Sequence, residues 1–357
     1  MSTASVSARG LRPALLVATL LVACGTVPPE SRAALAATAA SASSPNAFAT
    51  AADALVAAFE GTAGIWVSDP ASVVPAYTRN PDGLVVTASL YKLAILAHLE
   101  RLVEAKTLSY ADTITIEAAD VTADGAGEPP GTVLTVDDAL EAMITYSDNG
   151  PALAFLRMFG ATAINATLAD QHIAGFTIAA TPDGDNVVTP RALGTYFTLL
   201  AQRKLVSAAA SGRMLARLER QHINDRLPRD LPAGTAVAHK TGDLVGLNHD
   251  AGIIQTSRGP RVAVALTSGG TPLSASDLIA GLGSLVYAAA PTAKPPVIGA
   301  IGDGGAGGLS PALSAAAALA TLSAIVLARR RRASRVSRSL RRASGATAVW
   351  SPDRRGR

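Results

Sequence analysis

A serine and a lysine three positions apart are the first residues in this chain whose types and spacing could do chemistry. Ser89 and Lys92 lie just before the apolar run Leu93–Leu99, which predicts a buried helix. Residues three apart share one face of a helix. A serine hydroxyl is a weak nucleophile, and a neighbouring lysine amine can take its proton if burial lowers the lysine pKa. Free backbone N–H groups at the helix start would favour the developing negative charge.

The same two residues also fit a structural interpretation, in which the serine caps a helix and the lysine lies on the surface. None of the other four lysines has a serine three positions before it. The spacing is therefore unusual within this chain, and the catalytic interpretation depends on whether other motifs support it.

Two further motifs occur later in the chain. Ser147-Asp148-Asn149 comes after an apolar helical run that ends at Thr145, and Lys240-Thr241-Gly242 comes after the strand-like Thr235–Ala238. Ser-x-x-Lys, Ser-Asp-Asn and Lys-Thr-Gly together are the motif set of class A β-lactamases and penicillin-binding proteins. Each motif is weak alone, but three in order form a strong signal. The chain resembles the class A β-lactamase-like family from about residue 49 to about 290.

The pattern of helices and strands agrees with that resemblance. Helices are predicted over 49–60, from the Ser89 region onward, and over 137–145, 151–170, 191–220 and 274–290. Short strands are predicted at 65–67 and near Tyr77, and longer ones over 235–241, 250–256 and 261–268. Strands at both ends with helices between them predict an α+β fold, in which one antiparallel sheet is completed late. The resemblance implies a five-stranded sheet flanked by helices, beside an all-helical subdomain, with the site between them.

The resemblance also implies catalytic roles. Ser89 is the expected nucleophile and Lys92 the base that activates it. Ser147 would pass a proton to the leaving nitrogen, helped by Lys240. The backbone N–H groups of Ser89 and Asp243 would form the oxyanion hole.

A second group of residues is expected to hold the substrate. Asn149 can hydrogen-bond an amide of the substrate, whereas Asp148 is expected to be structural. Lys240 and Thr241 would bind the substrate carboxylate, and Gly242 would permit close backbone approach.

Three residues near these motifs keep two interpretations. Arg226 lies in Gln221–Pro228, which also resembles the family, and is either a second carboxylate anchor or half of a surface ion pair. His249 and Asp250 suggest acid–base work, but Lys92 and Ser147 already supply it. We therefore expect His249 and Asp250 to be structural residues, at a turn and at the start of the strand that follows it.

One departure from the family concerns the second half of the reaction. Class A β-lactamases carry a glutamate between the second and third motifs, which activates the water that frees the acyl-enzyme. This chain has no glutamate between Glu141 and Glu219. The acids between Gly150 and Thr189 are Asp170, Asp183 and Asp185, and the last two lie in an apparent turn. The sequence therefore supports acylation but not deacylation.

Composition narrows the possible partners. Of the net charge of +4, the tail from residue 329 contributes +10 and the first 23 residues +2, which leaves −8 for the rest. An acidic catalytic region argues against nucleic-acid binding. The single cysteine excludes an internal disulfide, and the histidines show no metal-ligand spacing, so no metal or cofactor is expected. We expect a monomer.

The flanks predict export and anchoring. Residues 1–24 read as a signal peptide, whose end at Cys24 resembles a bacterial lipobox; the alternative is an ordinary signal with an incidental cysteine. Residues 25–48 form a tether and 291–308 a Pro/Gly linker around the catalytic domain, 49–290. Residues 309–328 carry no charge and are followed by four arginines, which predicts a membrane-spanning helix with a cytoplasmic basic tail, 329–357. The alternative for residues 309–328 is a buried Ala-rich helix. A lipid on Cys24 and a spanning helix would be two anchors for the same purpose, so one of these two predictions is redundant.

Truncation after Pro291 combined with Cys24→Ala is expected to release soluble protein from membranes, because both predicted anchors are then gone. Fractionation by ultracentrifugation measures this. A double variant that still pellets with membranes would disprove the predicted topology.

Three functions fit these features. The first is a serine hydrolase that opens β-lactam rings. The second is a D-alanyl-D-alanine carboxypeptidase-type cell-wall peptidase with the same nucleophile. The third is a membrane-anchored penicillin sensor that acylates once and stays modified. The missing glutamate favours the second and third, whereas the extent of the family resemblance favours the first.

Overall fold

The computed structural model describes residues 45–122, 127–181 and 184–289. The predictions for the signal peptide, Cys24, most of the first tether, the linker, the spanning helix and the basic tail fall outside the described residues, as does Asp183.

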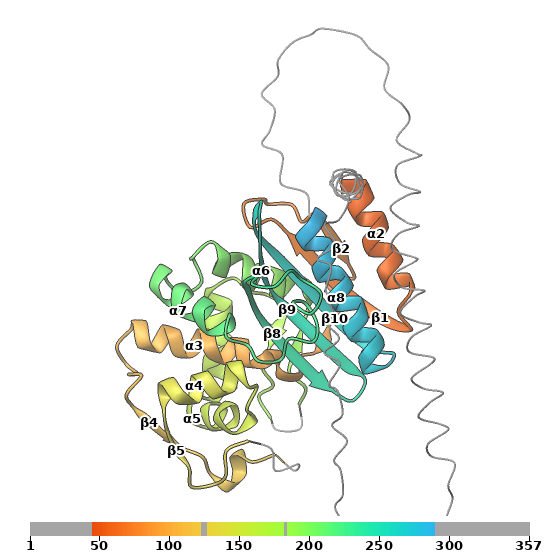
Figure 1. Cartoon of the computed structure of the whole chain (residues 1–357). Coiled ribbons are helices and arrows are strands. Elements are labelled where there is room, and N and C mark those ends of the chain that lie inside the picture. Colours follow the sequence, from red (N-terminus) through yellow and green to blue (C-terminus); the bar gives the residue numbers. More distant parts are fainter. Residues whose placement is uncertain (1–44, 123–126, 182–183, 290–357) are drawn as a thin grey trace, which may run out of the picture. The chain divides into compact units, whose positions relative to one another are not determined.

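The main sheet has five antiparallel strands in the order β2-β1-β10-β9-β8 (Figure 1). The strands are β1 (Gly61–Ser68), β2 (Tyr77–Arg79), β8 (Val237–Leu244), β9 (Leu247–Thr256) and β10 (Gly259–Gly269). Strands from the two ends of the domain are therefore neighbours, and the predicted α+β fold with a late-completed sheet is confirmed. The outermost strand, β8, carries the Lys-Thr-Gly motif.

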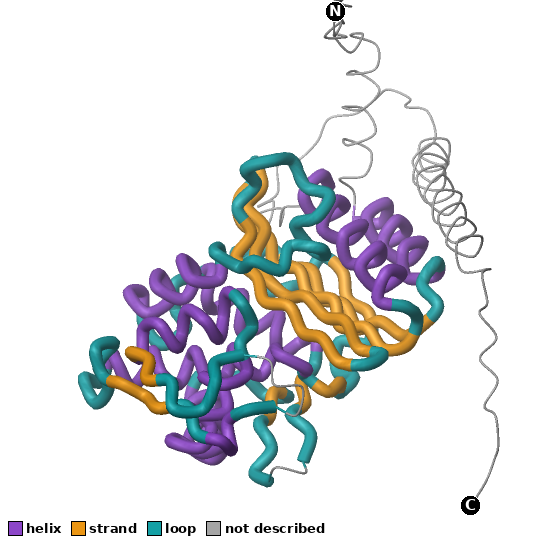
Figure 2. Tube along the Cα trace, turned by 60° about the horizontal axis from the view of Figure 1, so that its bottom comes forward, coloured by secondary structure: helices purple, strands orange, loops and turns teal. Residues whose placement is uncertain are grey.

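Two helices, α2 (Pro45–Ala57) and α8 (Pro272–Ala289), cover one face of this sheet (Figure 2). Phe48 of α2 and Ile279 of α8 are fully buried against Ile65 and Val67 of β1. Ala263 and Ala265 of β10 lie in the same cluster. Small side chains on the strand let the helices pack closely, which is how a chain with 4% aromatic residues still builds a dense core.

The helices on the other side of the sheet form a second core around α3 (Lys92–Glu104). Every residue from Lys92 to Glu100 is buried. The surrounding helices are α4 (Val136–Thr145), α5 (Asn149–Asp170), α6 (Pro190–Ala201) and α7 (Ala208–Leu218). Alone among the described helices, α5 is long and apolar enough to span a bilayer, but it breaks at Gly160 and packs against α3.

Local differences from the predicted elements have local causes. The helix predicted over 191–220 is two helices, because Arg203 and Val206 adopt positive φ and Ser207 caps α7 by accepting the N–H of Ala210. Ser89 lies in a 3₁₀ turn, η1 (Ala88–Tyr91), and the α-helix proper begins at Lys92.

Short elements that the sequence did not indicate complete the fold. Strands β3 (Val85–Val86), β6 (Phe176–Thr177) and β7 (Val187–Val188) form a small sheet, and β4 (Thr113–Thr115) pairs with β5 (Val133–Thr135). A further 3₁₀ turn, η2, spans Ala118–Asp120. The small sheet matters for the site, because β3 leads directly into the Ser89 turn.

Candidate active site

The turn that carries Ser89 is pressed against the edge of the main sheet. A Cβ atom on Gly242 of β8 would lie 3.0 Å from the carbonyl oxygen of Thr87 and 3.2 Å from Cβ of Ala88. Only glycine allows this approach without displacement, so the expected role of Gly242 has a steric basis. Ala88 itself adopts a positive φ of 45°, which is uncommon for a residue with a side chain.

Four oxygen atoms surround the amine of Lys92. Nζ lies 2.5 Å from the carbonyl oxygen of Ser147 and 2.7 Å from Oδ1 of Asn149. It lies 3.2 Å from Oγ of Ser89 and 3.3 Å from Oγ of Ser147. A neutral amine has two N–H groups and one lone pair. The two short contacts take the two N–H groups, which leaves the lone pair for the Ser89 hydroxyl.

The charge state that this geometry requires agrees with the surroundings. Burial is the main cause that lowers the pKa of Lys92 from 10.5 to about 6, and the positive charge of Lys240 lowers it further. The carboxylate of Asp148 opposes this shift. At neutral pH, Lys92 is therefore mostly an unprotonated amine, as a general base must be.

The Ser147 loop is held in a constrained shape. Ser147 has a positive φ of 62°, a conformation that costs about 1–3 kcal/mol for a residue with a side chain. The next residue, Asp148, caps α5 by accepting the N–H of Gly150 at 2.9 Å. A Cβ atom on Gly127 would lie 2.3 Å from that carboxylate, so the 127–131 loop also packs on it. The loop conformation brings Oγ of Ser147 to both lysines.

Lys240 reaches Ser147 from the opposite side. Its Nζ donates to Oγ of Ser147 at 2.9 Å and to the carbonyl oxygen of Thr241 at 3.0 Å. The side chain is fully buried, and this burial is the main cause that lowers its pKa to about 7. Oγ1 of Thr241 is buried without a hydrogen-bond partner. An unpaired buried hydroxyl is costly, so the site holds an unused donor where a substrate carboxylate is expected.

Arg226 lies beside the site, and both terminal nitrogens of its guanidinium bond protein groups. Its guanidinium is 4% exposed, forms an ion pair with Asp243, and donates to the carbonyl oxygen of His249 at 2.8 Å. It thus fastens the 221–227 segment to strands β8 and β9. The surface ion pair considered from the sequence does not describe this residue, because the guanidinium is buried; its role as a carboxylate anchor stays a prediction.

His249 has a contact that sequence reasoning missed. It lies inside β9 rather than at a turn, with Nε2 3.0 Å from the carbonyl oxygen of Val86 and Nδ1 accepting the N–H of Thr267 at 3.1 Å. The ring therefore connects the main sheet to β3, three residues before Ser89. Burial lowers the pKa of His249, which favours this neutral, structural form.

The segment that should supply a second base offers one described candidate near the nucleophile. Asp170 ends α5 and pairs with Arg101 at 2.6 Å. Asp185 is exposed, and the carbonyl oxygen of its neighbour Asn186 accepts the N–H of Thr87 at 2.8 Å, two residues before Ser89. Within the described part of the chain, no cluster of three or more histidine, cysteine or acidic side chains could hold a metal ion.

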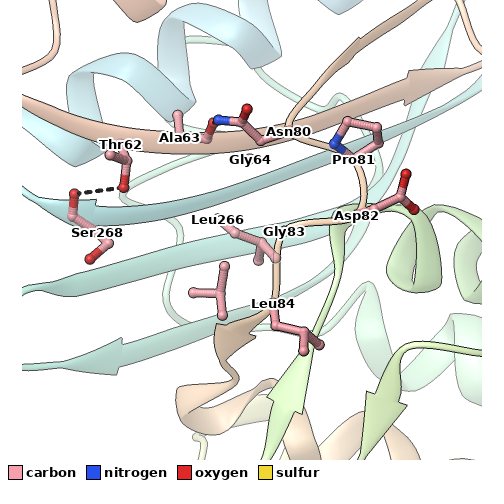
Figure 3. A pocket seen from close by; sticks show the side chains of 11 residues that line it. Thr62, Ala63, Gly64, Asn80, Pro81, Asp82, Gly83, Leu84, Leu266 and Ser268 are labelled. Carbon is pink, nitrogen blue, oxygen red and sulfur yellow. Dashed lines mark hydrogen bonds between the residues drawn. The ribbon is translucent and has the colours of Figure 1, made fainter.

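A separate hollow of about 400 Å³ lies between β1, β10 and the 80–85 turn. Figure 3 shows Leu84 and Leu266 in this hollow, with the hydroxyl of Thr62 bonded to the carbonyl oxygen of Ser268. None of the predicted catalytic residues lines it. The candidate active site is therefore located by the convergence of the three motifs and not by this pocket.

Comparison with known proteins points in the same direction as the geometry. The model of the beta-lactamase enzyme family matches residues 47–290, which is more than half of the chain. A β-lactamase from Sphaerobacter thermophilus DSM 20745 is 26% identical, with a TM-score of 0.60 over 66% of this chain and 95% of that one. A search of curated proteins found no match.

Two further solved structures are similar. PBP-A, in a variant solved as an acyl-enzyme complex with penicillin G, is 26% identical, with a TM-score of 0.62 over 68% of this chain and 95% of that one. A β-lactamase from Chitinophaga pinensis DSM 2588 is 20% identical, with a TM-score of 0.61 over 66% of this chain and 96% of that one, and supports the fold alone.

Proposed function

Because this chain belongs to the β-lactamase enzyme family, we propose that it is a serine hydrolase that opens β-lactam rings and forms an acyl-enzyme at Ser89. The observation that carries the proposal is the amine of Lys92, whose two short contacts to carbonyl oxygens leave its lone pair for Oγ of Ser89. The test is covalent attachment of penicillin, measured by intact-protein mass spectrometry. A protein that gains no mass contradicts the proposal.

The proton transfers during acylation return Lys92 and Ser147 to their starting protonation states. Oγ of Ser89 attacks the lactam carbonyl carbon while its proton moves to Nζ of Lys92. When the C–N bond of the ring breaks, the nitrogen takes the proton of the Ser147 hydroxyl. Nζ of Lys92, 3.3 Å from that oxygen, replaces the proton and becomes neutral again. The protonated form of Lys240, which donates to Oγ of Ser147, attracts the substrate carboxylate.

Substrate specificity would come from the walls of the site. Oδ1 of Asn149 is occupied by Lys92, so its amide N–H₂ remains for an acceptor on the substrate. Thr241 offers its unpaired hydroxyl, and Lys240 its charge, to a carboxylate. A compact molecule with an amide and a carboxylate around a strained carbonyl fits these groups.

A second candidate is a peptidase that acts on D-Ala-D-Ala termini, with Ser89 again as the nucleophile. It is favoured by the position of β8 as an outer strand of the sheet beside the Ser89 turn, because an extended peptide can add to an outer strand. Release of D-alanine from a D-Ala-D-Ala peptide, compared with hydrolysis of a β-lactam, distinguishes the two. A protein that is labelled by penicillin but turns over neither substrate is the sensor.

We expect the acylation rate to show a narrow bell-shaped dependence on pH. The rate rises as Lys92 loses its proton around pH 6, because only the neutral amine is a base. It falls as Lys240 loses its proton around pH 7, because the neutral form no longer attracts a carboxylate. The two limbs belong to the coupled pair of lysines. Stopped-flow acylation between pH 5 and about 9 measures them, and a constant rate across that range would contradict the assignment of both lysines.

A further inference from the structure

His239, the residue before Lys240, is enclosed by polar groups from two other segments. Its side chain is 1% exposed. Nδ1 lies 2.9 and 3.1 Å from the two carboxylate oxygens of Asp250, and Nε2 lies 3.0 Å from Oδ1 of Asn224. Gly252 pairs with His239 across the strands, and a Cβ atom there would lie 2.5 Å from Cβ of His239. Glycine at position 252 therefore leaves room for the start of the His239 side chain.

The hydrogen-bond partners around the ring fit an imidazole that donates from both nitrogens. Nδ2 of Asn224 donates to the carbonyl oxygen of Gln221 at 2.8 Å, so Oδ1 of Asn224 faces His239 and must accept. Nε2 therefore carries a hydrogen. Nδ1 faces a buried carboxylate and carries a hydrogen as well. An imidazole that donates from both nitrogens is the cationic form.

Asp250 bonds this ring and acts on Lys240 through its charge. It is fully buried, pairs with Thr241 across the strands, and accepts the N–H of Leu227 at 3.0 Å. Its negative charge raises the pKa of Lys240 against the stronger effect of burial, and Asp243 acts in the same direction. The charge of Arg226 lowers the pKa of Lys240, and the amine of Lys92 is the other titratable group that faces Ser147.

We propose that His239 is a positioning residue for the Lys-Thr-Gly motif: held as a cation by Asn224, it neutralises Asp250 and so limits how firmly Lys240 keeps its proton. Lys240 then stays close to its charge transition under working conditions. The kinetic part of this proposal rests on the proposed function, whereas the charge state of the ring does not.

The charge state is tested directly by NMR. The full chain is labelled with ¹⁵N-histidine, and the His239 ring is assigned by comparison with His239→Gln. At pH 7 both ring nitrogens are expected to carry a proton. A spectrum in which one His239 nitrogen lacks its proton would overturn the proposal, whatever the protein does to a β-lactam.

The kinetic test uses two variants with opposite expected signs. In His239→Gln, Asp250 is no longer neutralised, and the alkaline limb of the pH profile, where the acylation rate falls, shifts to higher pH by roughly one unit. In Asp250→Asn, Lys240 loses a negative charge that favours its protonated form, and the alkaline limb shifts to lower pH by roughly the same amount. Limbs that move in the same direction, or that do not move, refute the coupling.

A matched control and a second variant keep this test decisive. His98→Gln removes another buried histidine, which is bonded to Thr167 at 2.8 Å in the helical part of the domain, and should leave the limb in place. Asn224→Leu removes the acceptor for Nε2 without touching the strands. If Asp250→Asn does not fold, Asn224→Leu must still move the limb upward, and an unchanged limb would overturn the proposal.

Discussion

Replacing Ser89 with alanine is expected to abolish covalent labelling by penicillin. The acyl-enzyme is an ester on Oγ of Ser89, so the variant has no oxygen on which that ester can form. The reaction also loses the atom that faces the lone pair of Lys92 at 3.2 Å. Intact-protein mass spectrometry should show one adduct per chain for the unaltered protein and none for Ser89→Ala.

Two further variants give this result its meaning. Ser109→Ala alters an exposed serine in the helical part of the domain and should be labelled as fully as the unaltered protein. Lys92→Met fills the same space without a base and should react far more slowly. Adducts that survive in Ser89→Ala would place the nucleophile elsewhere and remove the basis of the proposed mechanism.

The second large effect concerns release of the acyl group. We expect the acyl-enzyme to accumulate, so that nitrocefin hydrolysis shows a burst of about one equivalent before a slow phase. Water needs a base near the ester, and general-base assistance typically contributes about 10²–10⁴-fold in rate. No glutamate lies between Glu141 and Glu219, and Asp170 is committed to Arg101 at the end of α5.

Asp183 and Asp185 are the residues that could reverse this expectation. Asp185 is exposed, next to the residue whose carbonyl oxygen bonds Thr87. Rapid turnover without a burst would contradict slow deacylation. If turnover is rapid, its loss in Asp185→Asn or Asp183→Asn would identify the substitute base, while its persistence in both variants would leave Lys92 as the activator of water.

The sequence predicted those parts of the site in which a catalytic motif lies next to a strand or helix with a regular apolar pattern. Strands β8, β9 and β10, helix α3 that begins at Lys92 and helix α4 that precedes the Ser147 loop could be predicted from apolar patterns of ordinary length. The two-residue strands β3, β6 and β7 are too short to show a period, so they could not be predicted. The 3₁₀ turn that precedes the α-helix at Lys92 packs against Gly242 of β8, a contact that no local sequence pattern contains.

The contacts of the residues that surround the catalytic groups could not be predicted, for a different reason. His249 bonds Val86, which is 163 positions earlier, and Arg226, in the loop before β8, bonds Asp243 within β8. Such contacts depend on the register of the sheet. The register is set by the whole set of buried strand faces rather than by any one segment. His239 offered one usable signal, its place directly before Lys240, but the partners of its ring become visible only once β8 and β9 are paired.

The pairing of β1 with β10 also affects how the protein reaches its native state. Thr62 and Ser268 face each other across this pair although they are 206 positions apart. Closing so long a loop has an entropic cost that is met before the contact stabilises the chain, so sheets of this kind fold slowly. Helices α3 and α4, which hold Lys92 and lead into Ser147, are closer together in sequence. We therefore expect the pairing of β1 with β10 to be a late step of folding, after the local contacts of the helices have formed.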